Sequence, residues 1–279
     1  ALTTANNNTA VGRNSGKFMT SGAANVSLGN YSLQDNTTGD SNIAVGYEAV
    51  ANNTTGSNNI GIGPDALKAN TTASDNVAVG AAALDANTTG TSNNAFGRHA
   101  LGGCVDGSYN VAMGANALKA NTSASYNTGL GHGAATATTT GSQNTAVGCN
   151  SLLSNTTGQQ NVAIGYDALG DNTTAANNVA VGAYALATCA TGTSNTAVGQ
   201  GALYTSTASE NTAIGNKALY SCTTGAQNLA AGYWSLHGLT TGSGNTALGG
   251  NWCGSNITTG GQNTAVGENS LKSLTTGQS

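Results

Sequence analysis

The sequence predicts an all-β fold, a β-solenoid or β-roll of about sixteen coils with seventeen residues in each. The pentapeptide Asn-x-small-apolar-Gly recurs along the chain. Its first eleven intervals are all of seventeen residues, and the last four are of sixteen, seventeen, seventeen and eighteen. A period this strict indicates one structural unit stacked on the next. Such a unit is too short for two helices and a turn. A Gly at position 5 and usually another at position 15 favour two short extended segments joined by sharp corners, where Gly supplies positive φ.

The repeat accounts for nearly the whole chain. Residues 1–7 form an N-terminal extension, and residues 8–279 form a single repeat array. Numbered from its Asn, the unit reads N-[TV]-A-V-G-x-x-A-L-x-x-N-T-T-G-x-x. The copies start at Asn8, Asn25, Asn42, Asn59, Asn76, Asn93, Asn110, Asn127, Asn144, Asn161, Asn178, Asn195, Asn211, Asn228, Asn245 and Asn263.

Reading each position along the copies predicts which side chains are buried. Position 4 is apolar throughout, as at Leu28, Ile62 and Phe96, so we expect it to face a core. Position 9 is mostly Leu, with Val50 and Ala135 among the exceptions, and forms a second predicted core column. Position 3 is only Ala, Ser or Gly, which implies that another backbone or a facing column lies close by. Position 2 mixes Val, Ile and Thr, as expected of a half-buried strand site.

Position 12 predicts an inward ladder of asparagines. The same column also holds Cys104, Cys189, Cys222 and Leu239, and a column that accepts Asn, Cys and Leu does not face solvent. Stacked amides can bond to one another and to backbone groups at the corner. The predicted structural ladder consists of Asn36, Asn53, Asn70, Asn87, Asn121, Asn155 and Asn172.

The charge pattern argues against nucleic-acid and membrane partners. The formal net charge is −4, and seven Lys and Arg residues are scattered along the chain, so no basic stripe for nucleic acid exists. The sequence contains no apolar run of about 18 residues, so we expect no membrane insertion. The composition would suggest disorder, but a strict repeat stabilises itself through contacts between neighbouring copies.

No residue pattern suggests catalysis, a cofactor or a metal. His99, His132 and His237 fall in copies that are not adjacent, without a repeating Cys or carboxylate partner. Neither a nucleophile elbow nor a phosphate-binding loop is present. Three of the five cysteines share column 12, Cys253 falls in the Leu column and Cys149 sits on a corner, so we expect buried, apolar-like thiols. We therefore expect no enzyme, no cofactor and no metal site.

The recurring NTAVG, followed by A-L and NTTG, closely resembles the repeats of phage and phage-like tail-fibre proteins. It resembles more loosely the N-S-V-A-I-G-like head repeats of trimeric autotransporter adhesins, which form a left-handed β-roll. The resemblance covers about residues 8 to 277 and implies a parallel homotrimer, joined to flanking fibre domains, in an extracellular location on a virion fibre or a cell surface.

An independent argument also favours three chains. Each coil supplies only two or three sizeable apolar side chains, so one thin roll would be marginally stable alone. Three rolls around a common axis could bury the position 3 Ala and one apolar column. The function expected is that of a structural segment of an extended surface fibre, giving rigidity and spacing, with attachment to a host or surface as a further role.

Contact with a cell-surface receptor or glycan would come from the variable corner positions 6, 7, 10 and 11. The residues we would expect to make it are Tyr47, Arg98, Tyr166, Tyr184 and Tyr233; the alternative is that they are only solvent-facing corner residues. An ice-binding β-solenoid that uses the Thr columns at positions 13 and 14 is the alternative function. Because consecutive strand residues point to opposite faces, only one Thr of each pair would face outward.

Overall fold

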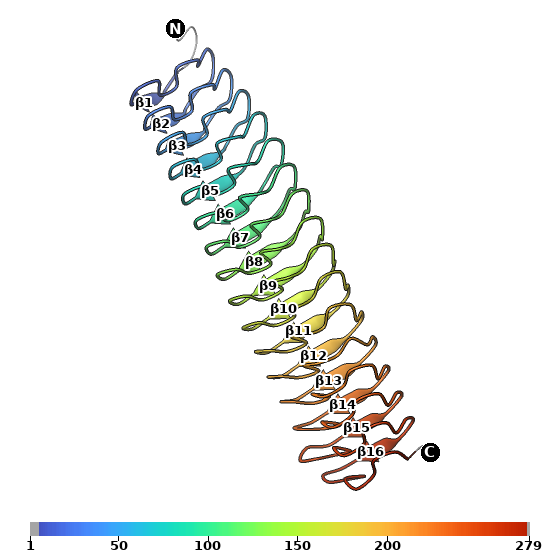
Figure 1. Cartoon of the computed structure of the whole chain (residues 1–279). Helices are drawn as coiled ribbons and strands as arrows, with labels where there is room; N and C mark the ends of the chain where they lie inside the picture. Colours follow the sequence, from blue (N-terminus) through green and yellow to red (C-terminus); the bar gives the residue numbers. More distant parts are fainter. Residues whose placement is uncertain (1–5, 278–279) are drawn as a thin grey trace. The chain divides into compact units, whose positions relative to one another are not determined.

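The chain forms a parallel β-solenoid in the computed structural model, which describes residues 6–277 (Figure 1). The described residues contain sixteen strands and no helix. The chain divides into two compact units, Ala1–Ser142 and Gln143–Ser279, each built from the same coil. The predicted all-β class and the solenoid are confirmed, as is the period of about seventeen residues that separates Asn36 from its ladder partner Asn53.

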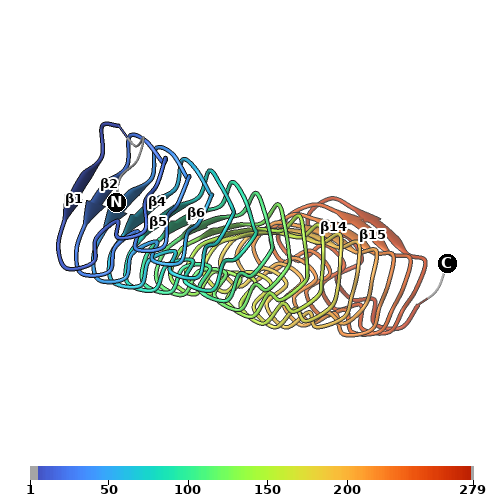
Figure 2. The same ribbon diagram turned by 90° about the horizontal axis from the view of Figure 1, so that it is seen from above.

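Each coil contributes one three-residue strand at positions 2 to 4. The strands of the first unit are β1 (Thr9–Val11), β2 (Val26–Leu28), β3 (Ile43–Val45), β4 (Ile60–Ile62), β5 (Val77–Val79), β6 (Asn94–Phe96), β7 (Val111–Met113) and β8 (Thr128–Leu130). Each pairs in parallel with its neighbour in the next coil, as Val26 does with Ile43. The strands therefore follow one another along one side of the coils (Figure 2).

The second unit repeats this arrangement. Its strands are β9 (Thr145–Val147), β10 (Val162–Ile164), β11 (Val179–Val181), β12 (Thr196–Val198), β13 (Thr212–Ile214), β14 (Leu229–Ala231), β15 (Thr246–Leu248) and β16 (Thr264–Val266). The one shortened and the one lengthened interval do not disturb the pairing, since Thr196 pairs with Thr212 and Thr246 with Thr264. Insertions and deletions are absorbed at the corners.

The corners differ from the prediction in which residues take positive φ. Gly at position 5 does so, as at Gly80 (φ 134°). Gly at position 15 does not. At Gly56 a Cβ would lie 2.1 Å from the carbonyl oxygen of Ala73 in the next coil, so this position holds only Gly or, as at Ala73 itself, Ala. Positions 7, 9 and 17 take the left-handed conformation with ordinary side chains, as at Ala82 (φ 52°) and Leu84 (φ 53°). The second predicted extended segment is replaced by turns and bends.

The core lies inside each coil, between positions 3, 8 and 9. The position 9 leucines are fully buried, as predicted, except Leu271 in the last coil, which is 38% exposed. Position 3 faces them directly: a Cβ on Gly61 would lie 2.5 Å from Cγ2 of Val50, and one on Gly129 would lie 3.1 Å from Cγ of Leu118. This facing column explains why only Ala, Ser or Gly occurs at position 3.

The prediction that position 4 faces the core is wrong. In a three-residue strand whose middle residue points inward, both flanking residues point outward. Leu28 is accordingly 47% exposed and Ile62 39% exposed, while Ala44 at position 3 is fully buried. Positions 2 and 4 therefore form two columns on the outer face of the strands, of which position 4 is apolar in every coil and position 2 mixes Val, Ile and Leu with Thr and Asn.

Two adjacent asparagine ladders, which share the position 15 carbonyl as an acceptor, hold successive coils together. The ladder at position 12 is confirmed: these asparagines are buried, and Asn53 Nδ2 donates to Asn36 Oδ1 at 2.8 Å and to the Gly56 carbonyl at 2.9 Å. A second ladder at position 1 was not predicted. There the backbone N–H of Asn59 donates to Asn42 Oδ1 at 2.9 Å, and Asn59 Nδ2 donates to the Ala73 carbonyl at 2.8 Å.

Candidate functional site

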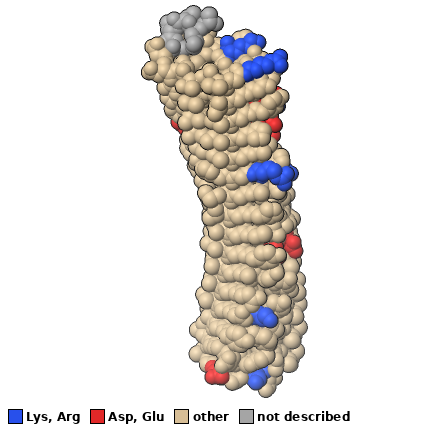
Figure 3. All heavy atoms as spheres, turned by 90° about the vertical axis from the view of Figure 1, so that its left-hand side faces the viewer, with Lys and Arg blue, Asp and Glu red and all other residues tan. Residues whose placement is uncertain are grey.

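The corner that follows each strand, at positions 6 to 11, carries most of the reactive side chains. All seven Lys and Arg residues fall at its positions 6, 7 or 10: Arg13, Lys17, Lys68, Arg98, Lys119, Lys217 and Lys272. Figure 3 shows a face of which most carries no charged side chain. All Lys and Arg side chains and most of the aromatic ones therefore lie at this corner of the coils, with Tyr109 and Tyr126 at position 17 among the exceptions.

In the second unit this corner carries a run of aromatic rings, which we call the aromatic strip. It consists of Tyr204, Tyr220, Tyr233, Trp234, His237 and Trp252. Tyr204 stacks on Tyr220 with ring centroids 5.1 Å apart, and Tyr220 stacks on His237 at 5.4 Å. These three residues lie at position 10 of successive coils, so the spacing of their rings follows the spacing of the coils.

The strip continues through the two tryptophans. The rings of His237 and Trp234 are stacked at 4.2 Å, and Trp252 meets Trp234 edge to face at 4.5 Å. Tyr233 lies against Trp234 at 5.8 Å. Tyr233 and Trp252 are the exposed members, at 49% and 39%, whereas the stack beneath them is half-buried.

Two lysines lie over the rings of the strip. Lys217 Nζ is 5.5 Å from the Tyr220 centroid and 5.4 Å from that of Trp234, and Lys272 Nζ is 5.8 Å from that of Trp252. In the part of the chain that the structure describes, neither lysine forms an ion pair. Burial, and next the charge of Lys217, lower the pKa of His237, so both favour the neutral form of this ring.

The same corner of the first unit has a different character. Lys68 forms ion pairs with Glu48 and, at 3.2 Å, with Asp65, so its charge is neutralised locally. A hydrogen bond from Lys68 is the main cause that lowers the pKa of Glu48. Tyr31 and Tyr47 form an edge-to-face pair at 6.3 Å.

The structure separates the five residues predicted for surface contact. All are exposed. Tyr166 and Tyr184 form an edge-to-face pair with ring centroids 5.3 Å apart. Tyr184 also lies edge to face with Tyr204 of the aromatic strip, at 6.5 Å between centroids. Tyr233 belongs to the strip itself, whereas Tyr47 and Arg98 lie in the first unit. From the sequence, Trp234 and Trp252 are expected to be corner neighbours, and the structure brings their rings together. Tyr204, Tyr220, His237 and Lys217 were not placed in this group, because their grouping shows only when positions 7 and 10 of successive coils are compared.

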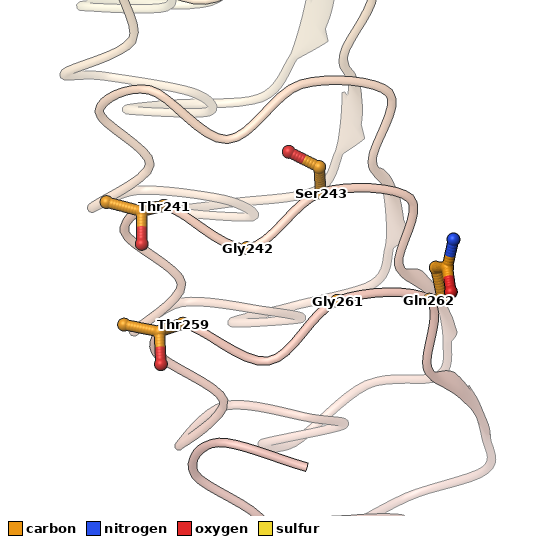
Figure 4. Close-up of a pocket in the computed structure, with 6 residues that line it drawn as sticks. All are labelled: Thr241, Gly242, Ser243, Thr259, Gly261 and Gln262. Atoms are coloured by element: carbon orange, nitrogen blue, oxygen red, sulfur yellow. The ribbon is translucent and has the colours of Figure 1, made fainter. Parts of the chain in front are cut away.

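A depression of about 390 Å³ lies on another side of the coils in the second unit (Figure 4). Its walls are small and polar: Thr241, Gly242, Ser243, Thr259, Gly261 and Gln262. It forms because Gly244 and Gly261 stand where most other coils carry larger polar side chains. The walls contribute no charged or aromatic group for a ligand.

Four of the five cysteines are buried, and Cys149 is exposed. Burial raises the pKa of the Cys104 thiol to about 12 and those of Cys189 and Cys222 to about 11. Their thiols donate to the carbonyls of Gly107, Gly192 and Gly225, replacing the amides of the position 12 ladder. Cys253 does not occupy the Leu column. The coil that starts at Asn245 has one extra residue, which moves Cys253 to the place of position 8. The Cys253 carbonyl accepts the Leu236 N–H, as the carbonyl at position 8 does in other coils, and Gly254 occupies the place of the position 9 leucine.

No group of three His, Cys, Asp or Glu residues that could hold a metal ion occurs among residues 6–277. Within the same range no helix has the length and hydropathy needed to cross a membrane. No family model matches the chain, and no curated protein matches it.

Proposed function

We propose that this chain is a structural segment of an extended surface fibre of the tail-fibre or adhesin type, located outside the cell on a virion or a cell surface. Its role there is to give rigidity and spacing between flanking fibre domains. The observation that supports this best is the number of bonds that join each coil to the next.

The step from the coil at Asn42 to the coil at Asn59 illustrates these bonds. Backbone N–H groups of Ile43, Val50 and Thr54 donate to the next coil at 2.8 to 2.9 Å. Side chains add three more: the Asn42 amide oxygen accepts from the Asn59 N–H, Asn70 donates to Asn53, and the Thr54 hydroxyl donates to the Thr71 carbonyl at 2.9 Å. Repeats bonded in this way resist local opening, because each coil is held by both neighbours.

Association of three parallel chains is part of the proposal, and the outer face of the strands supports it. Position 4 presents a partly exposed apolar side chain in every coil, and position 2 adds Val, Ile or Leu in half of them. Contiguous apolar patches of this kind mark interfaces. The most exposed side chains at position 4 are those of Val11, Leu28, Ile62, Phe96, Met113, Leu130, Ile164, Val198, Ile214, Leu248 and Val266. Because the face repeats with every coil, the partner that matches it best is another copy of the same repeat.

The interface differs from that expected from the sequence. Position 3 is already buried inside its own coil, so trimerisation would cover positions 2 and 4. Light scattering over a wide concentration range tests this: we expect a mass of three chains that persists on dilution. The double variant Ile62→Lys, Ile164→Lys should dissociate, whereas Thr72→Lys and Thr157→Lys at exposed position 14 should not. A folded monomer of the unaltered chain would overturn the trimer.

Ice binding is a second candidate, supported by one column of hydroxyls. At position 14 of successive coils, Thr38, Thr55, Thr72 and Thr89 are all exposed. Position 13 contributes little, because its hydroxyls are bonded internally, as Thr37 is to the Thr54 carbonyl at 2.9 Å. Ice binding predicts thermal hysteresis that disappears when Thr55, Thr72 and Thr89 become Tyr. No hysteresis in the unaltered chain would exclude it.

A further inference from the structure

We propose that the aromatic strip of the second unit binds a polysaccharide chain of pyranose units that carry carboxylate groups. This inference specifies the ligand for the attachment role in the proposed function. It rests on the proposed function in one respect, namely that the polysaccharide belongs to a cell or virion surface. The strip lies at the corner and not on the outer face of the strands, so the inference does not depend on how many chains associate.

Exposure of the rings is the first reason. Most coils fill these corner positions with small or polar residues such as Ala, Asn and Gln, so the fold itself does not require aromatic side chains there. Tyr233 and Trp252 nevertheless keep about half and about two fifths of their surface in solvent. Large, partly exposed aromatic residues backed by a rigid layer are typical of binding hot spots.

The available ring faces are the second reason. Tyr204, Tyr220 and His237 are stacked with interplanar angles of 9° and 4°, so their faces are used by one another and the stack serves as a rigid support. Trp252 meets Trp234 at 61°, which leaves a face of Trp252 free of ring stacking. A ring face is the negative part of an aromatic quadrupole, and it attracts the weakly positive C–H groups on the apolar side of a pyranose.

Periodicity is the third reason. The two exposed rings, Tyr233 and Trp252, lie in successive coils, which are about 5 Å apart. An extended pyranose chain repeats over a comparable length, so successive sugars can meet successive coils. A ligand of this shape would lie parallel to the stacking direction.

The lysines indicate the charge of the ligand. Lys217 lies between two rings of the strip, and among the described residues it has no ion-pair partner, unlike Lys68 in the first unit. A carboxylate on the sugar would supply that partner. Single-stranded nucleic acid also stacks on aromatic rings, but it requires a positively charged groove. The second unit has only two cations, Lys217 and Lys272, against four Asp and Glu residues, which argues against it.

Tryptophan emission tests the inference directly, because the only two tryptophans of the chain, Trp234 and Trp252, both belong to the strip. The full chain is titrated with oligogalacturonate, with a neutral cello-oligosaccharide and with oligothymidylate. We expect a saturable change in emission with oligogalacturonate alone, weakened by added salt. Light scattering on the same samples reports the number of chains separately, so failure of the trimer and failure of binding are distinguishable.

Variants locate the site by calorimetry. Trp252→Asn is suited to the left-handed backbone at this residue (φ 73°), and with Tyr233→Ala it should weaken binding about tenfold. Lys217→Gln should do the same for oligogalacturonate. The stacked pair Tyr109 and Tyr126, which lies outside the strip, provides the control: Tyr109→Ala should bind as the unaltered chain does. No binding, equal binding of the neutral oligosaccharide, preference for oligothymidylate, or unchanged binding by the Trp252 and Tyr233 variants would each overturn the proposal.

Discussion

The amide oxygen of Asn87 accepts no hydrogen bond, and the residue that follows it in the position 12 column is Cys104. In earlier coils the same oxygen accepts from the next asparagine, as Asn70 Oδ1 does from Asn87 Nδ2 at 3.1 Å. The Cys104 thiol donates only to the Gly107 carbonyl. Asn172, which precedes Cys189, has an unpaired oxygen for the same reason.

Restoring this ladder should stabilise the protein. We expect Cys104→Asn to raise the free energy of unfolding by about 1 kcal/mol, because a new amide would satisfy a buried acceptor. Cys189→Asn should act similarly beside Asn172. Cys222→Asn is the control, because Ser206 rather than an asparagine precedes it in the column. Thermal unfolding followed by circular dichroism measures the differences, and an equal gain in all three variants would contradict the explanation.

The position 1 ladder should be sensitive to loss of its donor. Asn59 Nδ2 donates to the Ala73 carbonyl, so Asn59→Asp would place a buried carboxylate against a carbonyl oxygen. We expect a loss of at least about 1–3 kcal/mol in unfolding free energy. The control is Asn52→Asp at an exposed corner, where the change should stay within about 0.5 kcal/mol. Urea unfolding compares the two, and similar midpoints would show that the ladder contributes little.

These ladders also show what the sequence could and could not predict. The period, the buried Leu column and the position 12 asparagines were readable because each repeats with little variation. The position 1 ladder was overlooked because its Asn served only to align the copies. Position 4 was misassigned because its apolar residues, such as Ile62, resemble a core column. The close neighbour that the small residues at position 3 imply was sought on another chain, whereas it is position 9 of the same solenoid, as Gly61 and Val50 show.

The candidate site was less predictable for a different reason. Tyr166, Tyr184 and Tyr233 were recognised as corner residues, because single positions can be assigned to the surface from the repeat. The stack of Tyr204, Tyr220 and His237 depends instead on how side chains turn toward the neighbouring coil. Rotamers of this kind are set by the packing of the corner rather than by the period.

The left-handed residues provide a test of the backbone. Ala82 has φ of 52°, a conformation that costs an L-residue about 1–2 kcal/mol and glycine almost nothing. Glycine also increases the entropy of the unfolded chain, which opposes the gain by about 0.4–1 kcal/mol. We expect Ala82→Gly to leave the stability unchanged or to raise it by up to about 1 kcal/mol.

The neighbouring residue supplies the matched control for that substitution. Ala81 does not have positive φ, so Ala81→Gly should only destabilise, by about 0.5–1 kcal/mol. Both variants are compared by urea unfolding. If Ala82→Gly destabilised as much as Ala81→Gly, the left-handed conformation at position 7 would be incorrect.

The buried cysteines predict how the thiols react and how stability depends on pH. A thiol-specific disulfide reagent should modify Cys149 in the native chain and the other four cysteines only after unfolding, because the thiolate is the reactive form and burial disfavours it. A folded-state pKa above the unfolded value means that the folded chain holds its proton more tightly. The stability from these groups is therefore fully present below about pH 9 and is lost as pH rises towards 11 to 12.

The triple variant Cys104→Ser, Cys189→Ser, Cys222→Ser isolates the thiols from other alkaline effects, because serine does not titrate in this range. Unfolding free energies of the variant and the unaltered chain should decrease differently with pH, and the unaltered chain should lose more between pH 9 and 11. All other titratable groups are the same in both proteins, so their contribution cancels in the comparison. Parallel curves of unfolding free energy against pH would mean that the three thiols are less buried than the position 12 column implies. In the modification experiment, rapid reaction of a second cysteine in the native chain would identify which coil opens.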